Sequence, residues 1–294
     1  MIILLSAADI LQVCAEAGTI RKGETPLAGR KYGLDLGTMN IRIFQGGHGL
    51  VVYEKNMIAI QRKKEVAAIG NDAFEMYERT PASIVISNPV RDGVIADINN
   101  MNKVAETLLK KCGCTTGFMR NNSFYLAVPS DVTEVEKRAY FDLIAHSAYN
   151  THNIFVVEKP LAAALGENVD VKSKKGMMIV DMGAGTTEIT VITMGGIVVS
   201  KLLKVGGNTI NASICQLVKE RHHLVIGDKT AEYLKLELGH AIPGQGRGKT
   251  VFGRDVITGL PSKAEVSDHL VFDSMKNYLF QVVRTIRNIM ETIP

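Results

Sequence analysis

Cysteine is scarce in this chain of 294 residues, and the four cysteines show no spacing that would build a metal or disulfide site. Cys112 and Cys114 are separated by a single glycine, and no second group of cysteines or histidines completes a zinc site around them. Cys14 and Cys215 stand alone in the sequence. We therefore expect free thiols, which are typical of the cytosol.

The chain also lacks a long apolar run. No stretch reaches the roughly 18 consecutive apolar residues that would span a bilayer as a helix. The start of the chain has no basic segment and no clear cleavage site of a secretory signal. These absences predict a chain that stays in the cytoplasm.

An excess of charge of one sign is missing too. The chain has 34 Lys and Arg against 30 Asp and Glu, which gives a formal net charge of +4. Its basic clusters, near Arg62, Lys110 and Lys172, are short and are not interleaved with aromatic residues, so we expect no nucleic-acid binding. Apolar residues make up 46% of the chain, and at this length two globular domains are the better expectation.

The most informative stretch that is present is residues 177–193, MMIVDMGAGTTEITVIT. An apolar strand, a tight turn of small residues and a second alternating strand predict a β-hairpin. Small residues let the backbone N–H groups of the turn approach an anion, and Thr186 and Thr187 add hydroxyl donors. Asp181 ends the incoming strand, where it can face a cation. The turn therefore suits a phosphate group with magnesium.

The same plan occurs earlier, in YGLDLGTMNIRIF at residues 32–44. Asp35 ends the first strand, Gly37 and Thr38 form the turn, and an alternating strand follows. A single Asp-x-Gly turn is usually no more than a connection between strands. Two copies at the heads of two half-chains are what a protein needs to hold a polyphosphate between two lobes.

These hairpins and several further motifs resemble the superfamily of actin, sugar kinases and heat-shock ATPases, and within it the bacterial actin (MreB/Mbl) family. The resemblance extends from about Tyr32 to Pro294. The motifs that carry it are LDLGT, NPVRDGVIAD, VEKRA, EKPLAAALG, VDMGAGTTE, VGGNTINASI, IGDKTAEYLK and GRDVITGLP.

The resemblance implies an α/β fold of the actin-like ATPase type, in which two RNase H-like lobes flank a nucleotide cleft. It places an N-terminal extension at 1–31, lobe 1 at 32–160 with a small insertion at about 56–97, and lobe 2 at 161–294 with an insertion at about 205–266. Family members continue with a strand, a glycine-rich adenine loop and a closing helix, which this sequence does not show, so we expect a C-terminally incomplete fold. A fragment and a naturally shortened paralogue are both open.

For the site, the resemblance implies ATP and Mg²⁺, with Asp35 and Asp181 at the metal. Contacts to the nucleotide are expected from the two turns and from two helices: Gly37, Thr38, Met39, Asn40, Gly183, Ala184, Gly185, Thr186, Gly207, Glu232 and Lys235. Met39 stands where the family has alanine, and Ala184, where the family has glycine, is tolerable only with a negative φ. Glu232 and Lys235 also fit an ordinary i,i+3 pair on a helix surface.

Catalysis is assigned through the resemblance to Glu136, which would orient the attacking water, together with Thr186. The activity it implies is a slow, magnesium-dependent ATPase coupled to polymerisation. Glu136 has a second interpretation, because Thr133-Glu134-Val135-Glu136 matches a capping box, in which Glu136 reaches back to the helix N-terminus.

As function, the resemblance implies a filament-forming cytoskeletal protein that lies peripherally at the inner face of the membrane and directs cell-wall synthesis and rod shape. Its implied partners are other copies of the chain, arranged head to tail, and the cell-wall elongation machinery. Phe118 and Met119 lie in a loop that touches the membrane in similar proteins, or that is simply anchored on the core. Residues 1–18 are either a leader or a helix lying on the membrane. Two alternatives remain: a small-molecule kinase of the same superfamily, and a truncated, non-hydrolysing paralogue that co-assembles with a full-length relative.

Three further expectations concern local structure. Asn208 is expected to cap a helix, and residues 267–292 are expected to form a long amphipathic helix. Residues 243–250 imitate a Walker loop, but Pro243 replaces its first glycine and an extended segment follows it, so we expect a surface loop there.

Overall fold

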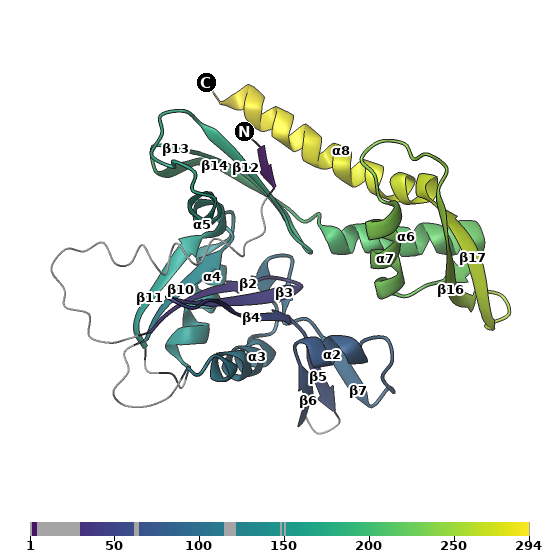
Figure 1. Cartoon of the computed structure of the whole chain (residues 1–294), viewed down its shortest axis with the longest axis horizontal. Coiled ribbons are helices and arrows are strands. Elements are labelled where there is room, and N and C mark those ends of the chain that lie inside the picture. The colour runs from purple at the N-terminus through teal and green to yellow at the C-terminus, as the bar shows by residue number, and fades with distance from the viewer. Residues whose placement is uncertain are drawn as a thin grey trace. The chain divides into compact units, whose positions relative to one another are not determined.

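The structure is a computed structural model that describes residues 2–4, 30–61, 65–114, 122–147, 149 and 151–293. It divides into two compact units (Figure 1). The first unit contains Met1–Gly183 and Glu188–Leu202, and the second contains Ala184–Thr187 and Leu203–Pro294. The two predicted lobes, with their boundary after residue 160, stay a prediction. The loop with Phe118 and Met119, and residues 5–29 of the N-terminal extension, lie outside the described residues.

A five-stranded sheet forms the centre of the first unit, with the strand order β11-β10-β2-β3-β4. Its strands are β2 (Lys31–Leu36), β3 (Asn40–Gln45), β4 (Gly49–Lys55), β10 (Asn122–Val128) and β11 (Thr151–Glu158). β2 and β3 pair antiparallel, which confirms the first predicted hairpin, and β10 runs parallel to both β2 and β11. The direct pairing of Asp35 with Arg42 across β2 and β3 places their side chains on the same face of the sheet.

Side chains alternate between the two faces of this sheet, as the sequence pattern predicts. On one face, Leu34 and Ile43 pack with the buried faces of α3 (Ile98–Lys111) and α4 (Glu134–Ala145). On the other face, Phe44 and Tyr125 pack with the alanines of α5 (Lys159–Gly166). α5 contacts β10 and β11, and it also contacts β12 of a second sheet (Figure 1). The face that carries Asp35 and Arg42 is therefore the face that α5 covers.

The second sheet has the strand order β1-β12-β13-β14. Its strands are β1 (Ile2–Leu4), β12 (Met177–Met182), β13 (Thr187–Thr193) and β14 (Gly196–Leu203). β12 and β13 are hydrogen-bonded neighbours, which confirms the second predicted hairpin. Ala184, in the turn of this hairpin, does not have a positive φ. Alanine can therefore replace the glycine of the family at this position.

A small region inserted in the first unit has its own three-stranded sheet, with the order β6-β5-β7. Its elements are β5 (Ile58–Gln61), β6 (Glu65–Ile69), α2 (Asn71–Met76) and β7 (Ile84–Ser87), followed by the two-stranded β8 (Val90–Arg91) and β9 (Val94–Ile95). The sequence also predicts a helical stretch at residues 72–79, but α2 ends three residues earlier, at Met76. Glu78 has a φ of 69°, and a helix cannot continue through a left-handed residue.

The second unit packs three helices with a three-stranded sheet of order β15-β16-β17. Its elements are α6 (Gly207–His222), β15 (Leu224–Val225), α7 (Asp228–Leu238), β16 (Gly248–Asp255), β17 (Pro261–Ser267) and α8 (Asp268–Thr292). Buried residues of α6, α7 and α8 form one apolar core with Val251 and Val266 of the sheet. The prediction of the long C-terminal helix is confirmed, and Ser267 caps this helix by accepting a hydrogen bond from the Leu270 N–H.

The predicted cap of α6 is wrong. Gly206 is the residue before the helix, and Asn208 already lies within its first turn. The N–H of Gly206 donates to the hydroxyl of Thr209, so a threonine inside the helix satisfies the donor that precedes it. The N–H of Asn208 donates instead to the carbonyl of Ala184, at 2.8 Å. Asn208 therefore binds the turn of the second hairpin with its backbone.

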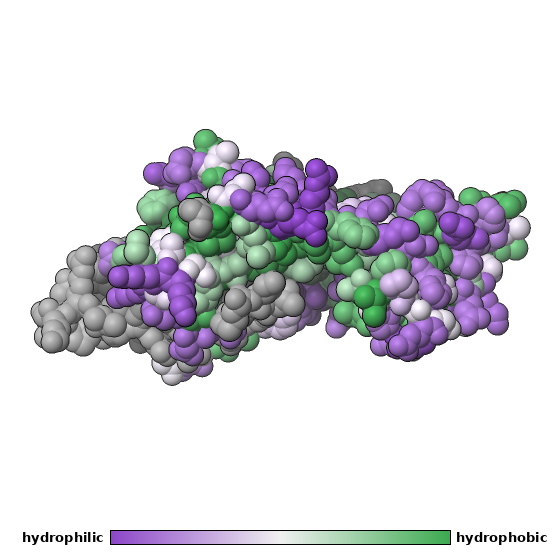
Figure 2. All heavy atoms as spheres, turned by 90° about the horizontal axis from the view of Figure 1, so that it is seen from above, coloured by the Kyte–Doolittle hydropathy of each residue, from purple (hydrophilic) through white to green (hydrophobic). Residues whose placement is uncertain are grey.

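The segment that imitates a Walker loop leads into β16, a strand, whereas a Walker loop leads into a helix. The loop between β16 and β17 exposes apolar side chains, with Ile257 82% and Leu260 65% exposed. Apolar atoms are visible at this end of the second unit in Figure 2. Within the part of the chain that the structure describes, no helix is both long and apolar enough to cross a membrane.

Candidate functional site

The turn of the first hairpin depends on a glycine. The N–H of Gly37 donates to the carbonyl of Asn40 at 3.0 Å, which closes the turn between β2 and β3. A Cβ atom on residue 37 would lie 2.8 Å from that same carbonyl oxygen, closer than a methyl group can approach. Only glycine fits this position without moving the backbone.

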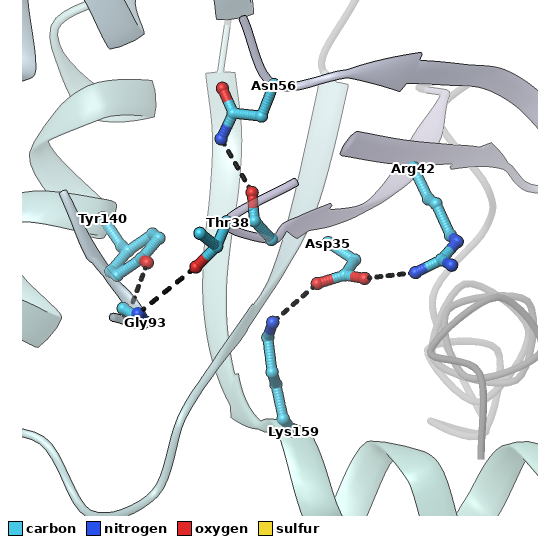
Figure 3. Close-up of polar contacts among 8 residues, drawn as sticks. Asp35, Thr38, Arg42, Asn56, Gly93, Tyr140 and Lys159 are labelled. Carbon is cyan, nitrogen blue, oxygen red and sulfur yellow. Dashed lines mark hydrogen bonds and ion pairs between the residues drawn. The ribbon is translucent and has the colours of Figure 1, made fainter. Parts of the chain in front are cut away.

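The carbonyl groups of this turn are satisfied by the protein itself. The side-chain amide of Asn56 donates to the carbonyl of Gly37 at 2.8 Å, and the Asn56 N–H donates to that of Met39 at 2.8 Å (Figure 3). The side-chain amide of Asn88 donates to the carbonyl of Thr38 at 3.2 Å. Among the described residues, no acceptor faces the N–H groups of Thr38 and Met39. The turn thus keeps its acceptors occupied and its donors available, which is the arrangement that binds an anion.

The remaining predicted residues of this turn have mixed surroundings. The hydroxyl of Thr38 accepts a hydrogen bond from the N–H of Gly93 at 3.4 Å (Figure 3). Met39 is 8% exposed, so most of its added bulk lies in the interior of the unit. The side-chain oxygen of Asn40 is buried and has no partner within the described part of the chain.

Asp35, near the end of β2, forms ion pairs with two basic side chains of the protein. Its Oδ1 lies 2.8 Å from Nζ of Lys159, and its Oδ2 lies 3.1 Å from a guanidinium nitrogen of Arg42 (Figure 3). The Asp35 side chain is only 3% exposed. Burial lowers the pKa of Lys159, but Asp35 and Asp181 outweigh it, and the pKa ends above its ordinary value. Lys159 is therefore charged at neutral pH.

Asp181, the corresponding residue of the second hairpin, makes no ion pair within 4.0 Å among the described residues. Burial raises its pKa, and Asp35 and Glu188 raise it further, while Lys159 and Arg42 lower it. Both aspartates thus act on the same two cations and on each other, so they lie in one neighbourhood of the first unit. Asp181 is the less neutralised of the two.

Magnesium fits this pair only in part. Asp181 has a carboxylate without an ion-pair partner within the described ranges, and its raised pKa indicates a charge that a bound cation would stabilise. Asp35 does not fit, because Lys159 and Arg42 occupy both of its oxygens. No group of three or more His, Cys, Asp or Glu side chains in the described ranges could hold a metal. The residues therefore do not fit a divalent cation that both carboxylates bind directly.

The turn of the second hairpin is attached to the start of α6. Besides the bond from Asn208 to the Ala184 carbonyl, the buried hydroxyl of Thr187 donates to the carbonyl of Val205 at 2.7 Å. No acceptor among the described residues faces the N–H groups of Gly185 and Thr186. This turn, like the first, keeps backbone donors available for an anion.

Two of the residues predicted to contact the nucleotide meet in the second unit. Nζ of Lys235, on α7, donates to the carbonyl of Gly207 at the start of α6, at 3.3 Å. Burial lowers the pKa of Lys235, and Glu232 and Asp228 oppose this. Lys235 forms no ion pair with Glu232 among the described residues, so the simple i,i+3 pair is not what the structure contains.

Glu136 forms the capping box. One of its carboxylate oxygens accepts from the Thr133 N–H at 2.7 Å and from the Thr133 hydroxyl at 2.8 Å, and the Thr133 hydroxyl in turn accepts from the Glu136 N–H. One turn later in α4, burial raises the pKa of Tyr140 to about 12, while Lys159 lowers it. The Tyr140 hydroxyl donates to the Gly93 carbonyl at 2.9 Å (Figure 3), so α4 and the first turn share Gly93 as a partner.

The sequence analysis missed four residues that build this site: Lys159, Arg42, Asn56 and Asn88. One of them had a signal. Arg42 lies directly opposite Asp35 once a hairpin with a four-residue turn, residues 37–40, is assumed, and such pairs interact. The asparagines had none, because they reach the turn from 19 and 50 residues further along the chain.

Comparison with known proteins gives one consistent result. A family model described as MreB/Mbl protein matches residues 29–294 of the chain. The cell shape-determining protein Mbl of Bacillus cereus is 33% identical over 267 residues, which are 90% of this chain and 79% of that protein. The cell shape-determining protein MreB of Escherichia coli is 35% identical over 270 residues, which are 89% of this chain and 76% of that protein.

A solved structure agrees with these relatives. The crystal structure of MreB5 of Spiroplasma citri bound to ADP is similar with a TM-score of 0.84 and 29% sequence identity. The similarity covers 92% of this chain and 80% of that one.

Proposed function

Because this chain belongs to the MreB/Mbl family, we propose that it is an actin-like cytoskeletal protein that binds ATP and assembles with other copies of itself into filaments. Its fold is the actin-like ATPase fold. The curated relatives are cell shape-determining proteins, and the matching structure contains ADP. A role in cell shape follows from the family, and the nucleotide from the matching structure.

The first turn is the observation that carries this proposal. Three donors of Asn56 and Asn88 occupy its carbonyl groups, and the N–H groups of Thr38 and Met39 remain for an anion. A turn that served only to connect two strands would not need two asparagines from distant elements to orient it. Fixed N–H donors of this kind bind phosphate oxygens without a cost of reorganisation.

The second turn offers the same chemistry at Gly185 and Thr186, and its N–H groups are proposed contacts to phosphate as well. Gly207, Glu232 and Lys235 are the proposed contacts to the remainder of the nucleotide. The bond of Lys235 to the Gly207 carbonyl supports this grouping, since it ties α7 to the start of α6.

For hydrolysis, the proposed residue that orients water is Glu136, with Thr186 beside the phosphates. The capping box and this role do not exclude each other. The Thr133 bonds to Oε2 of Glu136 hold the carboxylate in one orientation. Glu136 also acts electrostatically on Tyr140, as do Asp35 and Lys159, which supports a position close to the aspartate site.

The cellular setting is proposed from the family resemblance stated above. We assign the filaments to the inner face of the membrane, where they would organise cell-wall elongation. Phe118, Met119 and the N-terminal segment are the proposed membrane contacts. A liposome flotation assay with the double variant Phe118→Ser, Met119→Ser tests this, because loss of apolar side chains weakens membrane binding. Unchanged flotation would remove the loop from the proposal.

Sedimentation and electron microscopy with ATP, with ADP and without nucleotide test the function. We expect filaments that pellet with ATP and disappear in Asp181→Ala. The matched control is Asp170→Ala, which removes an exposed aspartate from a surface loop of the same unit. Filaments that form equally without nucleotide, or that Asp181→Ala leaves intact, would contradict the proposal.

A further inference from the structure

Arg42 contacts Asp35 on one neighbouring strand and Tyr53 on the other. Arg42 lies opposite Asp35 on β2 and opposite Tyr53 on β4, so the three residues form one row across the sheet. The guanidinium carbon lies 5.3 Å from the centre of the Tyr53 ring, within the range of a cation–π contact. The Arg42 side chain is 18% exposed, so its charge is held in place near the carboxylate rather than in solvent.

The carboxylate of Asp35 is paired with cations before any ion arrives. Lys159 and Arg42 contribute two positive charges, and Asp35 and Asp181 contribute two negative ones. Arg42 is ion-paired with Asp35 and also acts electrostatically on Asp181, so its charge influences both aspartates of the predicted metal site. A magnesium site normally presents uncompensated carboxylates, because these offset the cost of dehydrating the ion. At Asp35 the guanidinium of Arg42 already compensates the carboxylate.

We propose that Arg42 stands in for a divalent cation at Asp35, so that this chain binds the phosphates of a nucleotide with little dependence on magnesium. The inference rests on the proposed binding of ATP. A fixed guanidinium beside the phosphate turn offsets negative charge as a metal ion would, and its planar N–H groups suit phosphate oxygens. Unlike a metal ion, it is not lost when magnesium is withdrawn.

Equilibrium binding of a fluorescent ATP analogue, followed by anisotropy, tests the inference. The titration is done once with excess magnesium and once with EDTA, on the wild-type chain, Arg42→Met and Arg42→Lys. We expect the wild-type Kd to differ less than about threefold between the two conditions. Arg42→Met should bind about tenfold more weakly in EDTA and regain most of that loss with magnesium, because the charge it lost is then replaced. Arg42→Lys keeps the charge and should resemble the wild type.

Arg138→Met is the matched control. Arg138 also pairs with an aspartate, Asp142, at 2.8 Å and also lies over an aromatic ring, that of Phe141, but on the exposed surface of α4. It should leave the Kd unchanged in both conditions, and melting curves of all variants show whether they fold. A wild-type chain that binds only with magnesium, or an Arg42→Met variant with no added magnesium dependence, overturns the inference while leaving the nucleotide site. Absence of binding in every condition overturns the proposed function and the inference with it.

Discussion

The two hairpins share a plan in the sequence and differ in their chemistry. Both end a strand with an aspartate and continue into a turn whose N–H donors face no acceptor within the described residues. Asp35 of the first hairpin is almost fully buried between Lys159 and Arg42, whereas Asp181 of the second has no ion-pair partner in the same described ranges and a raised pKa. A repeated motif therefore gives its two aspartates different roles. We propose that the first supports the fold and that the second is available to a ligand.

The turns are also held differently. The first is clamped by side-chain amides from the residue after β4 and from the segment before β8, while the second is attached by the backbone of Asn208. A side chain can be removed by mutation, and a backbone group cannot. Loss of the asparagine side chain should thus destabilise the first turn more than the second.

The largest difference is expected between the two aspartates. Asp35→Ala leaves Lys159 and Arg42, which are 16% and 18% exposed, without their shared partner. It should lower the free energy of unfolding by about 3 kcal/mol, as when one partner of a buried ion pair is removed. Urea denaturation measures this. Asp181→Ala is the comparison, and a loss as large as that of Asp35→Ala would contradict the difference in roles.

A smaller effect is expected at the clamp of the first turn. Asn56→Ala removes the donor to the Gly37 carbonyl and should lower the free energy of unfolding by about 1–2 kcal/mol. Asn208→Ala keeps the backbone bond to the Ala184 carbonyl and should cost less than about 0.5 kcal/mol. Chemical denaturation of both variants makes the comparison. Equal losses would mean that the turns are held alike.

The pH dependence of Asp181 sharpens the contrast further. Burial raises its pKa in the folded state above the ordinary value of 3.8, so its ionisation opposes folding as pH rises above that value. Asp181→Asn should therefore melt about 1–2 °C higher than the wild type at pH 7, and the gain should shrink near pH 4. Melting curves of the wild type and of Asp181→Asn at both pH values test this prediction. A variant that melts lower at pH 7 would show that Asp181 is stabilised by the fold after all.

The smallest change in stability is expected at Glu136, which belongs to neither turn. Glu136→Gln keeps an oxygen that can complete the capping box, so stability should change by less than about 0.5 kcal/mol. ATP hydrolysis, measured by phosphate release, should nevertheless fall about 100-fold if the carboxylate orients water. Hydrolysis at the wild-type rate would leave Glu136 as a cap only.

The sequence predicts the features that depend on neighbouring residues. Alternation along residues 32–44 and 177–193 predicts both hairpins, and Thr133 with Glu136 predicts the cap of α4. The sequence does not predict the contacts that residues of distant segments make with the site. Lys159 shows in the sequence only as the start of a helix, and nothing near Asn56 or Asn88 indicates that they clamp a turn. At Gly206, the local preference for an asparagine cap gave way to a backbone bond with the second turn.

The central claim is that the N–H donors of the first turn bind the phosphates of ATP, and calorimetric titration with ATP tests it most directly. We expect one ATP per chain, with binding lost in Gly37→Ala, whose Cβ would collide with the Asn40 carbonyl. A variant that still unfolds cooperatively on heating shows that the loss is local. No binding by the wild-type chain, or full binding by Gly37→Ala, would contradict the account.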